Sequence, residues 1–246
     1  MAKFHKTEWD EEKIKEFWEL NELENELVSS KFLPPDFYAS ILKDVSSFMP
    51  PRGRVADIGA GTGTLCELLA DSGFDTYGVD ASEKGAAKLA EKFAALNKKV
   101  TVKTGLIYAI PFAADFFDCV FATEVLEHIL PEKLNAAVME VKRALKPGGG
   151  FILTVPYNET IQTAVCPDCH ALFPLNQHLS SFDEIKMSRL MESSGLEVKF
   201  CKLVPKLPLS GNFLKDTAKK LIAKIDKRII SFVYGSIFIT VAQKAR

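Results

Sequence analysis

A glycine-rich turn directly after a short apolar segment constrains the fold of this chain more than any other feature. The segment 54–58 has the apolar pattern of a buried strand, and Gly59, Gly61 and Gly63 follow it. The residues after the turn, 62–71, have helical spacing. Glycine permits positive φ and lets backbone amides approach a ligand closely. The sequence therefore predicts a strand, a ligand-binding turn and a helix in this order.

Strand and helix patterns alternate after this turn. This alternation predicts an α/β fold, in which a parallel sheet is covered by helices on both faces. The expected further strands are 75–79, 99–104, 117–122, 150–155, 196–204 and 236–243. The expected helices between them are 82–96, 131–145 and 182–194. Extra N-terminal helices are expected at 8–27 and 36–48.

Two details of the turn indicate the kind of ligand. A dinucleotide-binding turn has a third glycine where this chain has Thr64, and a phosphate-binding Walker turn has a lysine that is absent here. Asp57 lies two residues before the first glycine, where its charge would repel a pyrophosphate and attract ammonium and sulfonium groups. Asp80 ends the second strand, about twenty residues beyond the turn, where a carboxylate can accept both hydroxyls of a ribose.

These segments resemble class I S-adenosylmethionine-dependent methyltransferases, in particular the group that acts on quinones, lipids and other small molecules. The resemblance covers 54–155. Its matching blocks are 55–63, 77–81, 110–112 with 117–120, Glu-Val-Leu-Glu-His at 124–128, and Leu-Lys-Pro-Gly-Gly at 145–149. It implies a Rossmann-like, seven-stranded, mostly parallel sheet with an antiparallel final strand. S-adenosylmethionine would lie across the carboxyl ends of strands one, two and four.

The resemblance also implies which residues contact the cofactor. They are Asp57, Gly59, Ala60, Gly61, Thr62, Gly63, Asp80, Ala81, Thr123 and Glu124. The family commonly has an Asp after the glycine that ends strand three, whereas Gly105 is followed here by Leu106 and Ile107. We therefore expect backbone groups and apolar packing from Leu106 and Ile107 to hold the adenine.

Methyl transfer from a sulfonium requires alignment and exclusion of water, and it requires a base only when the acceptor is protonated at neutral pH. His128 follows the fourth strand and is the predicted catalytic residue, because an imidazole titrates near neutrality. The alternative is that His128 only packs the loop before Pro131. Tyr157, after the fifth strand, and His178 are predicted to contact the acceptor.

The segment 156–181 is predicted to be an irregular insertion that contains cysteine and histidine. Cys166 and Cys169 have the Cys-x-x-Cys spacing of half a tetrahedral zinc site, which His178 would complete. A plain loop of reduced thiols over the active site and a redox pair remain open alternatives. The redox reading has less support because no helix pattern follows the motif.

The ends of the chain add two expectations. We divide the chain into an N-terminal helical cap at 1–50 and a methyltransferase domain at 51–246. The segment 212–230 has the pattern of an amphipathic helix with a basic face. It either docks on the domain or makes a peripheral contact with an anionic membrane.

Composition narrows the class of protein. The formal net charge of −1 gives no general attraction to nucleic acid, so a nucleic-acid partner is not expected. Five cysteines, an odd count, and a polar start favour a reducing, cytoplasmic location. The pattern assigns no oligomeric state.

The sequence thus predicts an S-adenosylmethionine-dependent methyltransferase that acts on a small-molecule acceptor, apolar or lipid-like. One alternative is a non-catalytic S-adenosylmethionine-binding protein or regulatory subunit. The other is an NAD-dependent oxidoreductase, which Thr64 and Asp57 disfavour.

Overall fold

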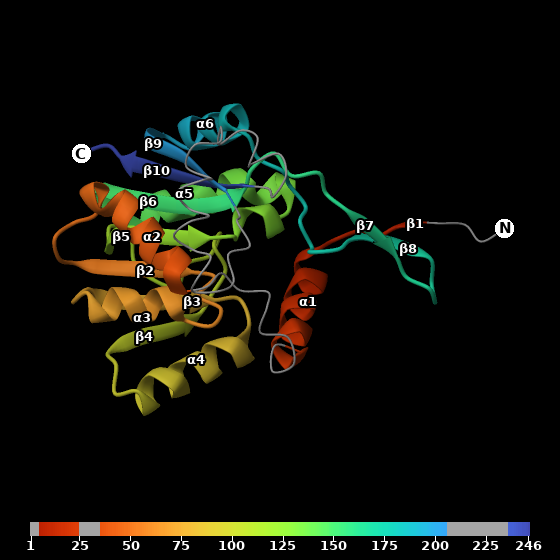
Figure 1. The fold of residues 1–246 in the computed structure, drawn as a ribbon, viewed down its shortest axis with the longest axis horizontal. Helices are drawn as coiled ribbons and strands as arrows, with labels where there is room; N and C mark the ends of the chain where they lie inside the picture. The colour runs from red at the N-terminus through yellow and green to blue at the C-terminus, as the bar shows by residue number, and fades with distance from the viewer. Residues whose placement is uncertain (1–4, 25–34, 206–235) are drawn as a thin grey trace, which may run out of the picture.

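The computed structural model contains a seven-stranded sheet between two layers of helices, and a smaller three-stranded sheet beside it (Figure 1). The structure describes residues 5–24, 35–205 and 236–246. The predicted amphipathic helix at 212–230, with its membrane contact, lies outside these residues. Among the described helices, none has the length and apolar character needed to cross a bilayer.

The main sheet has the strand order β4-β3-β2-β5-β6-β10-β9. Its strands are β2 (Arg54–Ile58), β3 (Asp75–Asp80), β4 (Val100–Thr104), β5 (Phe117–Thr123), β6 (Leu145–Pro156), β9 (Leu196–Pro205) and β10 (Ser236–Lys244). The strands from β2 to β6 pair in parallel, whereas β10 is antiparallel to both β6 and β9. The predicted fold class is therefore confirmed, including the antiparallel final strand.

Helices cover both faces of this sheet. One layer holds α2 (Pro35–Val45), α3 (Thr64–Asp71) and α4 (Glu83–Ala95), and the other holds α5 (Leu134–Ala144) and α6 (Glu184–Ser193). Val55 and Phe121 pack in the cluster that contains residues of α2 and α3. Their neighbours Ala56 and Val120 pack in the cluster that contains residues of α5 and α6. Because both faces are covered, the central strands read as nearly continuous apolar runs.

Several boundaries differ from the sequence-based expectation. The N-terminal helix is α1 (Glu11–Glu24), and the helix expected at 36–48 gives way after Val45 to a 3-10 turn, Ser46–Phe48. The helix expected at 131–145 is a 3-10 turn, Pro131–Lys133, followed by α5. The strand expected from residue 150 begins earlier, at Leu145. The pairing of β5 with β6 changes register between Phe117 and Cys119, so this part of β6 is irregular and has no simple apolar signature.

The segment 156–181 is not wholly irregular, and that part of the prediction is wrong. It contains β7 (Thr163–Val165) and β8 (Ala171–Pro174), which form an antiparallel hairpin. β1 (His5–Lys6) adds to β8 in parallel. This small sheet extends away from the main sheet on the side where α1 lies (Figure 1). Strands this short have no readable periodicity, and β1 comes from a distant part of the chain.

The strand order defines where a ligand site is expected. From β2 the chain continues to β3 and β4 on one side and then returns to β5 on the other side of β2. The connections after β2 and β5 therefore lead in opposite directions. In open α/β sheets, ligands bind at the carboxyl ends of the strands at such a point. The glycine-rich turn after β2 lies there.

Candidate functional site

A cavity of about 440 Å³ opens at the carboxyl ends of β2, β3 and β5. This volume lies within the usual range for small-molecule sites. Ten of its lining residues are predicted cofactor contacts: Gly59, Ala60, Gly61, Thr62, Asp80, Ala81, Leu106, Ile107, Thr123 and Glu124. The structure therefore brings together predicted contacts from four separate segments of the sequence. The other two predicted contacts, Asp57 and Gly63, do not line the cavity.

Glycine is required in the turn by both conformation and close contact. Gly59 has φ 77°, a region that side chains rarely adopt. A Cβ added to Gly59 would lie 2.6 Å from Cγ2 of Val125. The backbone N–H groups of Gly59 and Ala60 both donate to the carbonyl of Val79, at 2.7 and 3.1 Å. The turn is thus fixed against the end of β3 with the cavity in front of it.

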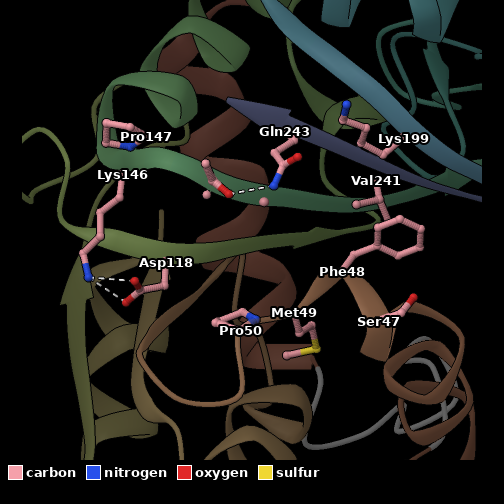
Figure 2. A pocket seen from close by; sticks show the side chains of 13 residues that line it. Ser47, Phe48, Met49, Pro50, Asp118, Lys146, Pro147, Lys199, Val241 and Gln243 are labelled. Atoms are coloured by element: carbon pink, nitrogen blue, oxygen red, sulfur yellow. Dashed lines mark hydrogen bonds and ion pairs between the residues drawn. The ribbon is translucent and has the colours of Figure 1, made fainter. Parts of the chain in front are cut away.

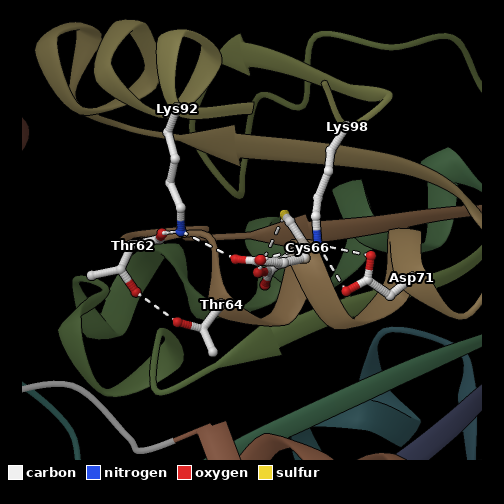
Figure 3. A network of polar contacts seen from close by, with 8 residues as sticks. Thr62, Thr64, Cys66, Asp71, Lys92 and Lys98 are labelled. Atoms are coloured by element: carbon white, nitrogen blue, oxygen red, sulfur yellow. Dashed lines mark hydrogen bonds and ion pairs between the residues drawn. The ribbon is translucent and has the colours of Figure 1, made fainter. Parts of the chain in front are cut away.

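Polar contacts tie the turn to α3 and α4 (Figure 3). The ammonium group of Lys92 donates to the carbonyl of Thr62 at 2.9 Å. The hydroxyls of Thr62 and Thr64 are hydrogen-bonded at 3.1 Å. Lys98 donates to Asp71 at 2.7 Å. Thr64 occupies the position of a dinucleotide glycine and is the first residue of α3. Its hydroxyl is therefore used to hold the turn.

Asp80, at the end of β3, holds the turn and lines the cavity. Its Oδ2 accepts the N–H of Gly61 at 2.9 Å, and its Oδ1 accepts the N–H of Ser82 at 3.0 Å. Burial raises the pKa of Asp80, and these backbone bonds oppose the rise. Each carboxylate oxygen can accept more than one hydrogen bond, so this side chain suits a ribose diol.

Asp57 lies beneath the turn and is only 2% exposed. The thiol of Cys66 donates to its Oδ2 at 3.7 Å, while Oδ1 has no hydrogen-bond partner among the described residues. Burial, with a smaller contribution from the charge of Asp80, raises the pKa of Asp57 to about 8. A buried carboxyl group without a counter-ion is costly. Asp57 does not line the cavity, so it would favour a ligand with ammonium and sulfonium groups through its charge rather than by direct contact.

Glu124 follows β5 in a strained conformation. Its φ is 54°, which is uncommon for a residue with a side chain. Three hydrogen bonds with Thr154 hold it. The Glu124 N–H donates to the carbonyl and to the hydroxyl of Thr154, at 2.9 and 3.2 Å, and the Thr154 hydroxyl donates to Oε1 of Glu124 at 3.0 Å. Strain of this kind is concentrated at functional sites.

The N-terminal helix α1 covers the cavity with apolar side chains. Ile14, Phe17 and Trp18 line it, and the Trp18 ring packs edge-on against the ring of His128 with centroids 4.8 Å apart. The second N-terminal helix, α2, behaves differently from the predicted cap: its residues pack in the core against the sheet, and it reaches the cavity through Tyr38. Among the described residues of the segment assigned to the cap, α1 contributes three side chains to the lining of the cavity and α2 contributes one.

His128 lines the cavity in an environment that disfavours its predicted role as a base. Its Nδ1 lies 3.2 Å from the backbone carbonyl of Gln177. A carbonyl only accepts, so Nδ1 carries the hydrogen. Burial, and secondly the neighbouring His178, lowers the pKa of His128 to about 3. An imidazole with so low a pKa accepts a proton poorly near neutrality.

His178 lies beside His128, as the prediction of an acceptor contact requires. The two rings have centroids 4.8 Å apart, and His178 lines the cavity. Its Nδ1 is hydrogen-bonded to the carboxylate of Glu159. No pattern in the sequence identifies Glu159, which follows β6 in an irregular stretch.

The structure does not bring the three predicted zinc ligands together. Cys166 and Cys169 lie in the turn between β7 and β8, where the His170 N–H donates to the Cys166 carbonyl at 2.9 Å. His178 comes after β8 and contacts His128 and Glu159 instead. Within the described residues, ligand atoms gather within 4.8 Å at Glu127, His128 and His178. That spacing alone assigns no metal.

Tyr157 also lies elsewhere than expected. It is absent from the lining of the cavity, and its hydroxyl donates to Oε2 of Glu184 at 2.7 Å. Its ring packs on Phe238. Conversely, Tyr38, Tyr108 and Asn176 line the cavity without having been identified from the sequence.

A second cavity, of about 450 Å³, lies at the opposite end of the main sheet (Figure 2). Its charged and amide side chains are already engaged: Lys146 pairs with Asp118 at 2.7 Å, Gln243 donates to the Gly148 carbonyl at 2.8 Å, and Lys199 pairs with Glu197. No residue predicted to bind cofactor or substrate lines it. The cavity at the carboxyl ends of the strands is therefore the candidate site.

Comparisons with known proteins find methyltransferases. A family model described as a methyltransferase domain matches residues 31–199. A ubiquinone biosynthesis O-methyltransferase of Sinorhizobium medicae is 33% identical over 124 residues, which cover 50% of this chain and 48% of that protein. A demethylmenaquinone methyltransferase of Renibacterium salmoninarum is 34% identical over 103 residues, which cover 42% of this chain and 41% of that protein. This chain thus spans about half the length of the curated relatives that it matches first.

Solved structures support the fold. Phosphoethanolamine N-methyltransferase 2 of Haemonchus contortus, in complex with S-adenosyl-L-methionine, aligns with a TM-score of 0.62 at 18% identity. The alignment covers 88% of this chain and 55% of that chain.

Proposed function

Because this chain belongs to the family of methyltransferase domains, we propose that it transfers a methyl group from S-adenosylmethionine to a hydroxyl group of a small, largely apolar acceptor. The observation that carries this proposal is the lining of the cavity at the carboxyl ends of β2, β3 and β5. One part presents the glycine turn and Asp80, and the other presents aromatic and imidazole side chains. Donor and acceptor groups therefore have adjoining places in one cavity.

The first part of the cavity suits the donor. Asp80 would accept the ribose hydroxyls, Leu106 and Ile107 would pack on the adenine, and Asp57 would favour the positively charged end. Once bound, S-adenosylmethionine supplies an electrophilic methyl group on a sulfonium. The NAD-dependent alternative has less support, because Thr64 occupies the position of the third dinucleotide glycine, and because Asp57, when ionised, would repel a pyrophosphate.

The second part suits the acceptor. Phe17, Trp18 and Leu130 make its wall apolar, which excludes water from the reacting atoms. His128 and His178 provide the polar groups that would hold a hydroxyl. An apolar compound with a phenolic or quinol hydroxyl matches this combination, and two relatives carry ubiquinone and menaquinone chemistry in their names. The presence of an acceptor space also argues against a purely regulatory cofactor-binding role.

A methyl-transfer assay tests the proposal. The purified chain is incubated with methyl-labelled S-adenosylmethionine and either a catechol with a short isoprenoid tail or phosphoethanolamine. We expect an O-methylated catechol with one equivalent of S-adenosylhomocysteine, and no labelled phosphoethanolamine. Labelling of the amine alone would contradict the proposal, and so would the absence of any labelled product across a broad panel of phenols and quinols.

The ionisation of Asp57 predicts how donor binding depends on pH. Its pKa of about 8 leaves the carboxyl group mostly protonated at neutral pH in the free protein. A cationic donor stabilises the ionised form, so binding lowers this pKa and releases a proton. Affinity for S-adenosylmethionine therefore rises between about pH 5.5 and 7.5, where the donor amino group stays mostly protonated. The rise is about threefold for a bound-state pKa lower by one unit and about twentyfold for two units.

Titration calorimetry at several pH values measures this rise. The Asp57→Asn variant is expected to bind S-adenosylmethionine with little pH dependence over the same range. S-adenosylhomocysteine, which lacks the sulfonium charge, should show a smaller rise with the wild-type protein. An affinity that falls as the pH increases, or a slope retained in Asp57→Asn, would exclude this role for Asp57.

Two further expectations stay predictions. Zinc at Cys166 and Cys169 would need ligands other than His178, and metal analysis of protein purified without chelators tests it. Peripheral membrane contact through 212–230 is tested by co-sedimentation with anionic liposomes at low salt.

A further inference from the structure

We propose that His178 is the catalytic base of this reaction and that Glu159 is its positioning residue. The inference rests on the proposed function, since only a protonated acceptor such as a phenol needs a base. His178 lines the cavity next to His128, and its Nδ1 is bonded to the carboxylate of Glu159. A carboxylate only accepts hydrogen bonds, so Nδ1 carries the hydrogen of the neutral ring. The lone pair of Nε2 is thereby left to take a proton from the acceptor.

The two histidines differ in what lies behind each ring. Behind His178 is the negative charge of Glu159, which stabilises an imidazolium as it forms. Behind His128 is the neutral carbonyl of Gln177, and its ring packs against the rings of Trp18 and His178. A positive charge on His128 would therefore have weaker compensation, because no carboxylate is hydrogen-bonded to its Nδ1. His128 is better suited to hold the acceptor as a neutral ring.

Titratable groups approach His178 from several elements. Glu159 comes from the segment after β6, while Glu127 and His128 come from the 3-10 turn Leu126–His128. From α1, Trp18 contacts the ring of His128, which in turn contacts the ring of His178. The charged groups of α1 form ion pairs with other segments, Glu11 with Lys133 and Lys15 with Glu83.

The acceptor O–H bond breaks, and its proton moves to Nε2 of His178. The oxygen electron pair forms a bond to the donor methyl carbon, while the carbon–sulfur bond breaks and its electron pair stays on sulfur as a neutral thioether. The imidazolium next to Glu159 then releases the proton to solvent, which the pair can reach because their side chains are 13% and 28% exposed.

The sharpest kinetic test varies the acidity of the acceptor. A plain catechol is protonated at neutral pH and needs a base, whereas a nitro-substituted catechol is largely ionised and does not. We expect His178→Gln to lower kcat for the plain catechol about 100-fold, within the usual range for loss of a general base. For the nitro-catechol, kcat should stay within about fivefold of wild type, because the same side chain then has no proton to remove.

Controls separate this role from a structural one. S-adenosylhomocysteine should bind His178→Gln with wild-type affinity. His170→Gln, in the β7–β8 turn and outside the cavity lining, should keep full activity on both acceptors. Glu159→Gln keeps an acceptor oxygen but loses the charge, so it should lower kcat for the plain catechol alone and leave the KM for the donor unchanged. Equal losses of kcat on both acceptors in His178→Gln would overturn the proposal. A loss confined to the plain catechol in His128→Gln, and absent from His178→Gln, would also overturn it.

A second readout needs no acceptor. Imidazole nitrogen NMR on the protein saturated with S-adenosylhomocysteine reports the tautomer of each of the four histidines. We expect the hydrogen of His178 on Nδ1, retained in Glu159→Gln and shifted toward Nε2 in Glu159→Ala. If the wild-type ring carries its hydrogen on Nε2, His178 is not the base. This measurement tests the arrangement of His178 and Glu159 even if no phenol is methylated. The absence of phenol methylation would contradict the proposed function, not the tautomer of His178.

Discussion

The Asp80→Asn variant is expected to bind S-adenosylhomocysteine about 1,000-fold more weakly than wild type, on the basis of two hydrogen bonds to a charged group at about 2 kcal/mol each. The carboxylate of Asp80 already accepts the N–H groups of Gly61 and Ser82. An asparagine keeps one oxygen and replaces the other with a donor, so one backbone bond and one ribose bond are lost together. The change therefore weakens both the turn and the ligand contact.

Asp75→Asn is the matched control for this loss. Asp75 begins the same strand, is exposed, and contacts Tyr77 and Arg54 outside the cavity. Its affinity for S-adenosylhomocysteine should stay within about twofold of wild type, as for most surface substitutions. Titration calorimetry measures both variants, and thermal unfolding without ligand checks that they fold. An Asp80→Asn affinity near that of wild type would remove Asp80 from the cofactor site.

The Gly63→Ala variant is expected to lower the free energy of unfolding by about 3 kcal/mol, from the cost of a left-handed residue plus overpacking. Gly63 precedes α3 with φ 77°. A Cβ there would lie 2.3 Å from Cδ1 of Leu89 and 2.9 Å from Cζ of Phe93, both in the core beneath the turn. Because Leu89 and Phe93 are buried, they have little room to move away.

Gly73→Ala isolates the two contributions. Gly73 also has a positive φ, 86°, but a Cβ there meets nothing within 4 Å. Its cost should therefore be about 1 kcal/mol, the conformational part alone. Urea unfolding of the two variants gives the difference that arises from contact with Leu89 and Phe93. Equal losses in the two variants would mean that the core adapts to the added methyl group.

The main sheet and the turn were accessible from sequence because their signals are local. A strand buried on both faces is a continuous apolar run, and the turn at Gly59 needs glycine for reasons that involve only the neighbouring strand ends. The three-stranded sheet was not accessible. β1 pairs with β8 across a long stretch of chain, and neither strand is long enough to have a period.

The cofactor part of the candidate site was predicted better than the acceptor part, for a related reason. Residue type and position at a strand end identify Asp80, whose neighbours in sequence also fix its orientation. The environment of His128 depends on Trp18, which α1 brings from far away, and on the carbonyl of Gln177. The hydroxyl of Tyr157 bonds to Glu184, which is distant in sequence and becomes its neighbour only in the folded protein. The direction of the Tyr157 side chain could therefore not be predicted from its position after β6. In the part of the cavity proposed for the acceptor, the protonation and the orientation of the side chains thus depend on packing between distant segments.

The most direct test of the cofactor assignment is titration calorimetry of the wild-type protein with S-adenosylhomocysteine and, separately, with NAD. The geometry of the turn, Asp57 and Asp80 predicts one S-adenosylhomocysteine bound per chain and no measurable heat from NAD. Binding of NAD without binding of S-adenosylhomocysteine would contradict the assignment.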